Sequence, residues 1–117
     1  MTSRDPLSIT AAACDAGDAL ALITRDGRYR YADLAALAQQ RLRTLPDAND
    51  APGPVTVVGS NTLDTLVTLY ALLDARRPAL LLHPKLTAHE QAQEIAATQR
   101  VAPLLPADAA AIIYTSG

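Results

Sequence analysis

The chain has 117 residues, of which half are hydrophobic and 19% are charged, with a formal net charge of −2 at pH 7. This length suits one domain, and the composition can bury a core, which excludes a disordered tail. Ten basic against twelve acidic residues leave no basic surface for nucleic acid. Four tyrosines, with no phenylalanine or tryptophan, offer few rings for stacking on bases. Nine of the ten basic residues are arginine, and the other is Lys85.

Signals for a compartment are few. The longest apolar stretches are broken by charged residues such as Asp74 and Arg76, so none reaches the ~20 residues that a membrane span needs. Cys14 has no second cysteine to pair with, and we expect a buried or half-buried thiol there. Asp5 and Pro6 interrupt the apolar run that a lipoprotein processing site at this cysteine would need. We therefore expect a cytoplasmic chain with no membrane span.

The first predicted elements are a hairpin and a helix. A short apolar run, an Asp-Gly turn signal and an alternating Arg-Tyr stretch predict a β-hairpin over residues 19–31. Apolar residues then recur at helical spacing from Ala32 to near Pro46, which predicts an amphipathic helix. Residues 47–54 are rich in Asp, Asn, Pro and Gly and are typical of an exposed loop.

The middle of the chain predicts a strand, a helix and a second strand. Residues 55–58 are β-branched, and helical spacing follows over residues 63–73. We expect Asn61 to cap this helix and Asp64 to lie at the positive end of its dipole. The uniformly apolar residues 79–82 predict a strand buried on both faces. Two strands separated by one helix form a βαβ unit, so we expect parallel strands joined by a right-handed crossover.

The last predicted elements are a capped helix and an apolar strand. Thr87 and Glu90 form a capping box for a helix that runs to about Arg100. After a segment interrupted by prolines, residues 109–114 predict a final strand. A parallel strand buried on both faces needs a further element to cover it. We therefore expect the chain to be cut within a fold.

Two stretches invite comparison with known sites. Gly59-Ser60-Asn61 stands at a strand-to-helix turn, where free amides suit an anion, although helix capping alone explains these residues. His89-Glu90 begins like the H-E-x-x-H zinc helix, but Gln93 stands where the second histidine belongs. We expect no metal site, with His83 in a loop and His89 on the solvent side of its helix.

The final tripeptide, Thr115-Ser116-Gly117, is the strongest candidate for binding. Ser116 lacks the G-x-S-x-G surroundings of a nucleophile, so we assign no catalytic residue. Two hydroxyl donors, together with backbone amides that glycine leaves approachable, suit the cradling of phosphate. The exit of an apolar strand is a fitting place for such a loop.

Three blocks of the chain, taken in order, resemble the adenylate-forming superfamily of acyl-CoA synthetases, nonribosomal peptide adenylation domains and luciferases. The family's opening hairpin and helix, DG-x-x-x-TY-x-EL, is similar to DGRYRYADLAALAQQRLRTL. The next family block, with its Leu-Thr-x-x-Glu helix start, resembles VTVVGSNTLDTLVTLYALLDARRPALLLHPKLTAHEQAQEI. The strand that leads to the phosphate loop YTSGTTGxPKG resembles ADAAAIIYTSG. Among subfamilies, the chain looks most like small-carboxylate ligases of the o-succinylbenzoate-CoA ligase type.

The resemblance implies an α/β fold, in which a parallel sheet with flanking helices in three layers is preceded by a β-hairpin. Residues 1–117 would be the N-terminal part of the AMP-binding large domain, truncated at the phosphate loop. In the family, a small carboxylic acid attacks the α-phosphate of Mg-ATP to give an acyl-adenylate and pyrophosphate. The thiol of coenzyme A then displaces AMP, which makes the parent enzyme an acid-thiol ligase. By resemblance, Thr115, Ser116 and Gly117 contact the β- and γ-phosphates.

The chain also departs from the family pattern. The rest of the loop, including its lysine, does not follow Gly117, and Lys85 matches neither family lysine. Arg76-Arg77-Pro78 occupy a bend that usually holds glycine. The link between the helix at Thr87 and the last strand is short, so the chain is either a compact variant or lacks part of the subdomain.

These departures lead to two hypotheses of function. In the first, the chain is a ligase fragment that is inactive alone and holds ATP, Mg²⁺ and coenzyme A at most weakly. The alternative is a self-contained small α/β binding or interaction module without catalysis. For the fragment of the first hypothesis, an uncovered sheet leads us to expect self-association.

Overall fold

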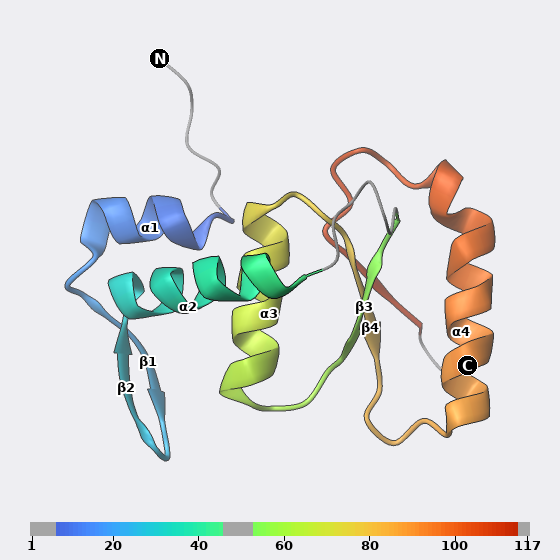
Figure 1. The fold of residues 1–117 in the computed structure, drawn as a ribbon, viewed down its shortest axis with the longest axis horizontal. Helices are drawn as coiled ribbons and strands as arrows, with labels where there is room; N and C mark the ends of the chain where they lie inside the picture. Colours follow the sequence, from blue (N-terminus) through green and yellow to red (C-terminus); the bar gives the residue numbers. More distant parts are fainter. Residues whose placement is uncertain (1–6, 46–52, 115–117) are drawn as a thin grey trace.

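The computed structural model describes residues 7–45 and 53–114, which form a mixed α/β fold (Figure 1). Its two sheets are an antiparallel hairpin and a parallel sheet of three strands. In chain order, the elements are α1 (Ile9–Ala16), β1 (Leu20–Thr24), β2 (Gly27–Arg30), α2 (Tyr31–Thr44), β3 (Val55–Val58), α3 (Leu63–Asp74), β4 (Ala79–Leu82), α4 (Ala88–Val101), the 3₁₀ helix η1 (Ala102–Leu104) and β5 (Ala111–Ile113).

The predicted hairpin and the helix after it are confirmed. β1 and β2 pair in antiparallel register, with Thr24 opposite Gly27 at the turn. The hydroxyl of Thr24 accepts hydrogen bonds from the amides of Asp26 and Gly27, at 3.2 Å each, and so closes the turn. Tyr31 belongs to α2 and not to the hairpin, because the Asp33 carboxylate accepts from the Arg30 amide and begins the helix one residue early. Most of the predicted loop at 47–54 lies outside the described residues.

Helix α1 was not predicted, because an alanine-rich stretch shows no apolar periodicity. Ser8 caps it by accepting a hydrogen bond from the Ala11 amide at 3.1 Å, and Ile9 anchors it in the core. The expectation of a buried or half-buried Cys14 is wrong, since this thiol is exposed. Cys14 follows Ile9 by five residues, which places it roughly 140° around the helix from the buried side.

The parallel sheet has the order β3-β4-β5, which confirms the predicted parallel pairing. Val57 of β3 packs with Leu72 of α3, whereas Leu80 of β4 lies beside Ile95 of α4. Residues 80 and 81 of one strand point to opposite faces, so α3 and α4 cover opposite faces of the sheet (Figure 1). The two crossovers therefore run over opposite faces, and the right-handed crossover through α3 stays a prediction.

The predicted burial is confirmed for β4 and is wrong for β5. Ala79, Leu80 and Leu82 of the central strand are 1–2% exposed because a helix covers each face. β5 lies at the edge of the sheet, where Ile113 is 65% exposed. β5 is as apolar in composition as β4. Ala111 and Ile113, however, point to the face of the sheet on which α3 lies, and α3 covers β3 and β4 but not β5.

Helix α3 connects two clusters of buried residues. Leu34 and Ala38 of α2 pack with Ile9 of α1 and Ala71 of α3 in one cluster. Leu72, the next residue of α3, packs against the sheet in the other. The hairpin, α1 and α2 thus lie on one side of α3, and the parallel sheet lies on its other side (Figure 1). No helix in the described ranges is both long and apolar enough to cross a membrane.

Candidate functional site

The exits of the three parallel strands gather at one edge of the sheet. β3 and β4 end in register at Val58 and Leu82, and the amide of Gly59 donates to the Leu82 carbonyl at 2.8 Å. β5 pairs Ile113 with Leu81 of β4, so Tyr114 follows at the same edge. In open α/β sheets, ligands bind at the carboxyl ends of the strands. This edge is therefore the candidate site.

The exit of β3 is built from hydroxyl groups. The Ser60 hydroxyl lies 3.2 Å from that of Thr62 and 3.0 Å from that of Thr65, and Thr65 is buried. Thr62 accepts from the Thr65 amide at 3.2 Å, so Thr62 is the N-cap of α3 and the prediction of Asn61 is wrong. Thr62 has the extended backbone that an N-cap requires, whereas Asn61 stands one residue too early.

These hydroxyl groups bond to one another and to nearby amides, so they are not arranged as donors for a phosphate. Gly59 is also not required by packing, because a Cβ there would lie an ordinary 3.7 Å from the Leu82 carbonyl oxygen. Asp64 lies in the first turn of α3 as predicted, and it also forms an ion pair with Arg41 of α2. Capping of α3 therefore accounts for the polar residues of this turn.

The exit of β4 leads into the predicted capping box. His83 lies in the loop, as predicted, and its Nδ1 accepts from the Lys85 amide at 3.1 Å. The Thr87 hydroxyl accepts from the Glu90 amide at 3.2 Å, and the Glu90 carboxylate accepts from the Thr87 amide at 3.0 Å, which confirms the box. The Thr87 amide holds the pKa of Glu90 below its ordinary value of 4.5. His89 is exposed, as predicted.

The exit of β5 leads to the residues for which we predicted phosphate contacts. Thr115, Ser116 and Gly117 lie outside the described residues. Tyr114, which precedes them, is 39% exposed, and its hydroxyl oxygen lies 2.9 Å from that of Thr98 in α4. Sequence reasoning assigned no role to Tyr114 or Thr98, because 16 positions separate them and no local pattern connects them.

A cleft of about 670 Å³ opens between the hairpin and the start of α3. Its walls are apolar where Ile23 and Leu66 face it, and Arg25 and Ser60 add polar groups. Clefts of this size hold small molecules in many proteins. The hairpin's part in this cleft was not predicted, because no local sequence pattern tells where the tip of a hairpin will pack.

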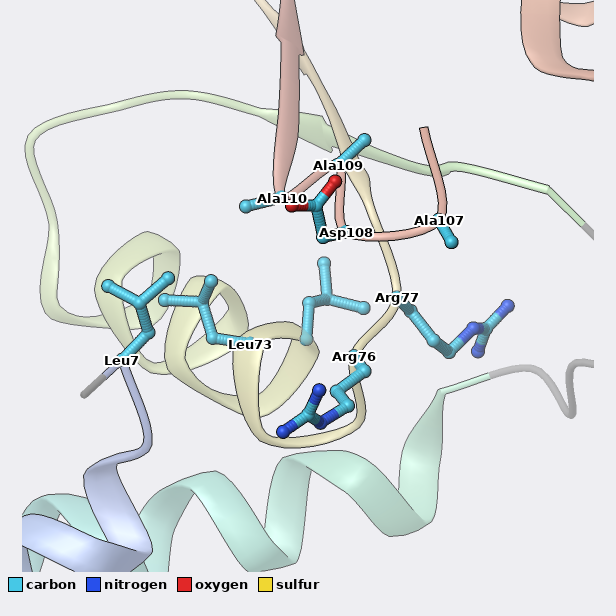
Figure 2. Close-up of a pocket in the computed structure, with 9 residues that line it drawn as sticks. Leu7, Leu73, Arg76, Arg77, Ala107, Asp108, Ala109 and Ala110 are labelled. Atoms are coloured by element: carbon cyan, nitrogen blue, oxygen red, sulfur yellow. The ribbon is translucent and has the colours of Figure 1, made fainter. Parts of the chain in front are cut away.

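A second pocket, of about 390 Å³, lies near the amino ends of the strands and is shown in Figure 2. Leu73 comes from the last turn of α3, Arg76 and Arg77 from the bend that follows it, and Asp108 from the turn before β5. The two guanidinium groups point away from Asp108 (Figure 2). The polar groups of this pocket therefore do not converge on a common point.

The described residues offer no site for a metal ion: no group of three or more His, Cys, Asp or Glu side chains within 7–45 and 53–114 could hold one. Comparison with known proteins adds no assignment, because no protein-family model matches the chain and no curated protein matches it.

Proposed function

We propose that residues 1–117 are the N-terminal part of an ATP-dependent carboxylate-CoA ligase, of the adenylate-forming superfamily and most similar to the o-succinylbenzoate-CoA ligase type. The parent enzyme would activate a small carboxylic acid as its adenylate and transfer the acyl group to coenzyme A, using Mg²⁺-bound ATP. Residues 1–117 alone are inactive in this proposal. Thr115, Ser116 and Gly117 would begin its phosphate loop.

The position of β5 carries the proposal. This strand lies parallel to β4, and its exit stands at the edge where β3 and β4 also end. A phosphate loop that follows Tyr114 would therefore begin at the carboxyl edge, where α/β sheets bind nucleotides. The order of hairpin, helix, βαβ unit and capped helix is also the order that the resemblance implies.

The bend after α3 adds independent support. The family usually has glycine there, and Arg76 stands in this chain with a φ of 55°. This is the left-handed region that glycine adopts without strain and that other residues seldom occupy. The glycine that the family usually has at this bend would suit the same backbone conformation, which supports the proposal although the side chain differs.

The exit of β3 has a structural role in this proposal. The hydroxyls of Ser60, Thr62 and Thr65 are engaged with one another. The phosphate donors of the parent enzyme would therefore come from the loop that follows Tyr114.

The experiment is a pyrophosphate-release assay with ATP and a panel of small carboxylic acids. Residues 1–117 should be silent, and a longer chain translated from the same gene should release pyrophosphate with at least one acid. In that longer chain, Ser116→Ala should lower kcat/KM for ATP about tenfold or more, because it removes a phosphate donor. Ser60→Ala is the matched control, since this hydroxyl is engaged with Thr62 and Thr65.

Turnover by residues 1–117 alone, or a longer chain that is inactive with every acid, would overturn the proposal. The cleft between the hairpin and α3 favours the second candidate function, a self-contained binding module. That alternative expects residues 1–117 to unfold cooperatively as a monomer. It also expects a stop codon directly after Gly117, which sequencing of the gene would reveal.

A further inference from the structure

The end of β5 is attached to helix α4 by a hydrogen bond whose direction follows from its surroundings. The hydroxyl oxygens of Tyr114 and Thr98 lie 2.9 Å apart. Thr98 donates its single proton to the Glu94 carbonyl of its own helix at 2.8 Å. The Thr98 oxygen must therefore accept, so the Tyr114 hydroxyl is the donor.

The acceptor is held firmly. Thr98 is 3% exposed, and its bond to Glu94 orients its hydroxyl within the third turn of α4. The first turn of the same helix is closed by the capping box of Thr87 and Glu90. The Thr98 hydroxyl oxygen therefore has a fixed position relative to the sheet. A hydrogen bond to this oxygen fixes the position of the residue that donates it.

The strand that carries the donor is held less firmly. β5 has three residues, and within the described sheet it pairs with β4 along one edge only. Ile113 contributes little packing because it is 65% exposed. Tyr114 shares its face of the sheet with Ile112, two residues earlier, and α4 covers that face. The bond from Tyr114 to Thr98 therefore anchors the strand at the end from which the chain leaves it.

We infer that Tyr114 is a positioning residue that fixes the exit of β5 against α4 through the Thr98 hydroxyl. For its consequence in catalysis, this inference rests on the proposed function, because the residues that follow Tyr114 are the predicted phosphate-loop residues. The tether sets the direction in which that loop begins. Tyr114 itself would contact no reacting group.

Amide hydrogen exchange on the 117-residue chain tests the tether without any ligand. Tyr114→Phe keeps the ring and removes the donor, while Thr98 keeps its bond to Glu94. Exchange at residues 111–114 should become about three- to tenfold faster, as loss of one hydrogen bond predicts. Exchange by local opening elsewhere, as in the exposed hairpin strand at residues 20–24, should stay unchanged, and the midpoint of thermal unfolding should fall by no more than the few degrees that one hydrogen bond accounts for.

Variants of the acceptor separate the tether from a general loss of stability. Thr98→Val should accelerate exchange at residues 111–114 as Tyr114→Phe does, and Thr98→Ser, which keeps the hydroxyl, should restore slow exchange. Thr68→Val is the matched control, because Thr68 makes the same bond to a carbonyl four residues earlier in α3 and no tyrosine bonds to it within residues 7–45 and 53–114. It should leave residues 111–114 unchanged.

Three results would overturn the inference: unchanged exchange in Tyr114→Phe, equal acceleration at residues 20–24, or no rescue by Thr98→Ser. In the longer chain, Tyr114→Phe should raise KM for ATP about three- to tenfold and leave KM for the carboxylic acid unchanged. An inactive longer chain overturns the proposed function, whereas the exchange result decides the tether on its own. An active longer chain with an unchanged KM for ATP overturns the loop-positioning role.

Discussion

Glycine at position 76 should make this protein more stable than alanine at the same position. Arg76 follows the end of α3 with a φ of 55°, its amide donates to the Leu73 carbonyl at 3.2 Å, and the Arg77 amide donates to the Leu72 carbonyl at 3.0 Å. This pair of bonds is the Schellman motif, whose left-handed position is usually glycine. A residue with a Cβ pays about 1–2 kcal/mol for this conformation. Glycine avoids this cost.

The expected gain is smaller than this cost, because glycine also gives the unfolded chain more freedom, at about 0.4–1 kcal/mol. The net stabilisation relative to alanine at the same position is then about 1 kcal/mol, or an unfolding midpoint about 4 °C higher. The Arg76 side chain makes an interaction of its own, and both glycine and alanine remove it. The comparison of Arg76→Gly with Arg76→Ala therefore isolates the backbone conformation.

Thermal unfolding followed by circular dichroism, with urea unfolding as a second measure, checks the result. The matched control is Ala75→Gly, because the preceding residue has a right-handed φ of −80°. Glycine there should destabilise the protein by about 0.5–1 kcal/mol. If Arg76→Gly is no more stable than Arg76→Ala, or if glycine has the same effect at both positions, the left-handed strain is not as described.

Three further predictions concern the core, the capping box and the sheet edge. Leu72→Ala should cost about 2–5 kcal/mol in urea unfolding, because Leu72 is 1% exposed, whereas Leu104→Ala, at an 82% exposed position, should cost little. The lowered pKa of Glu90 stabilises the fold above pH 4.5 and loses this effect as the pH falls through the folded-state pKa, so the stability difference between the wild type and Glu90→Gln should shrink in acid. Ile113→Lys should reduce the predicted self-association in sedimentation experiments, and Leu104→Lys, which adds the same charge away from the sheet, should not.

Most helices and strands could be predicted because their signals are local. The turn at Gly27, the β-branched residues of β3 and the capping box at Thr87 each specify a conformation through atoms a few residues apart. The prediction that Asn61 caps α3 was wrong, because the N-cap is the residue with an extended backbone directly before the helix. That residue is Thr62. Sequence reasoning also missed α1, where Ile9 alone is buried.

The candidate site was only partly predictable. The strand exits at Gly59 and His83 could be placed at one edge, since parallel strands share a direction. The contact between Tyr114 and Thr98 could not, because it depends on how α4 lies across the sheet. The apolar residues of the last strand likewise could not reveal that Ile113 would be exposed, since apolar composition is the same at the centre and at the edge of a sheet.

The sequence by itself thus determined the order of the elements that follow α1, from the hairpin to the last strand, and the parallel direction of β3 and β4, because periodicity, caps and connection length act over short distances. The tertiary structure alone decided that α4 covers the face opposite α3, that β5 lies at the edge, and that the hairpin borders a cleft. These features depend on which apolar surfaces meet, and an amphipathic helix buries its apolar side equally well against either face of a sheet. The packing of the whole chain therefore determines which face each helix covers.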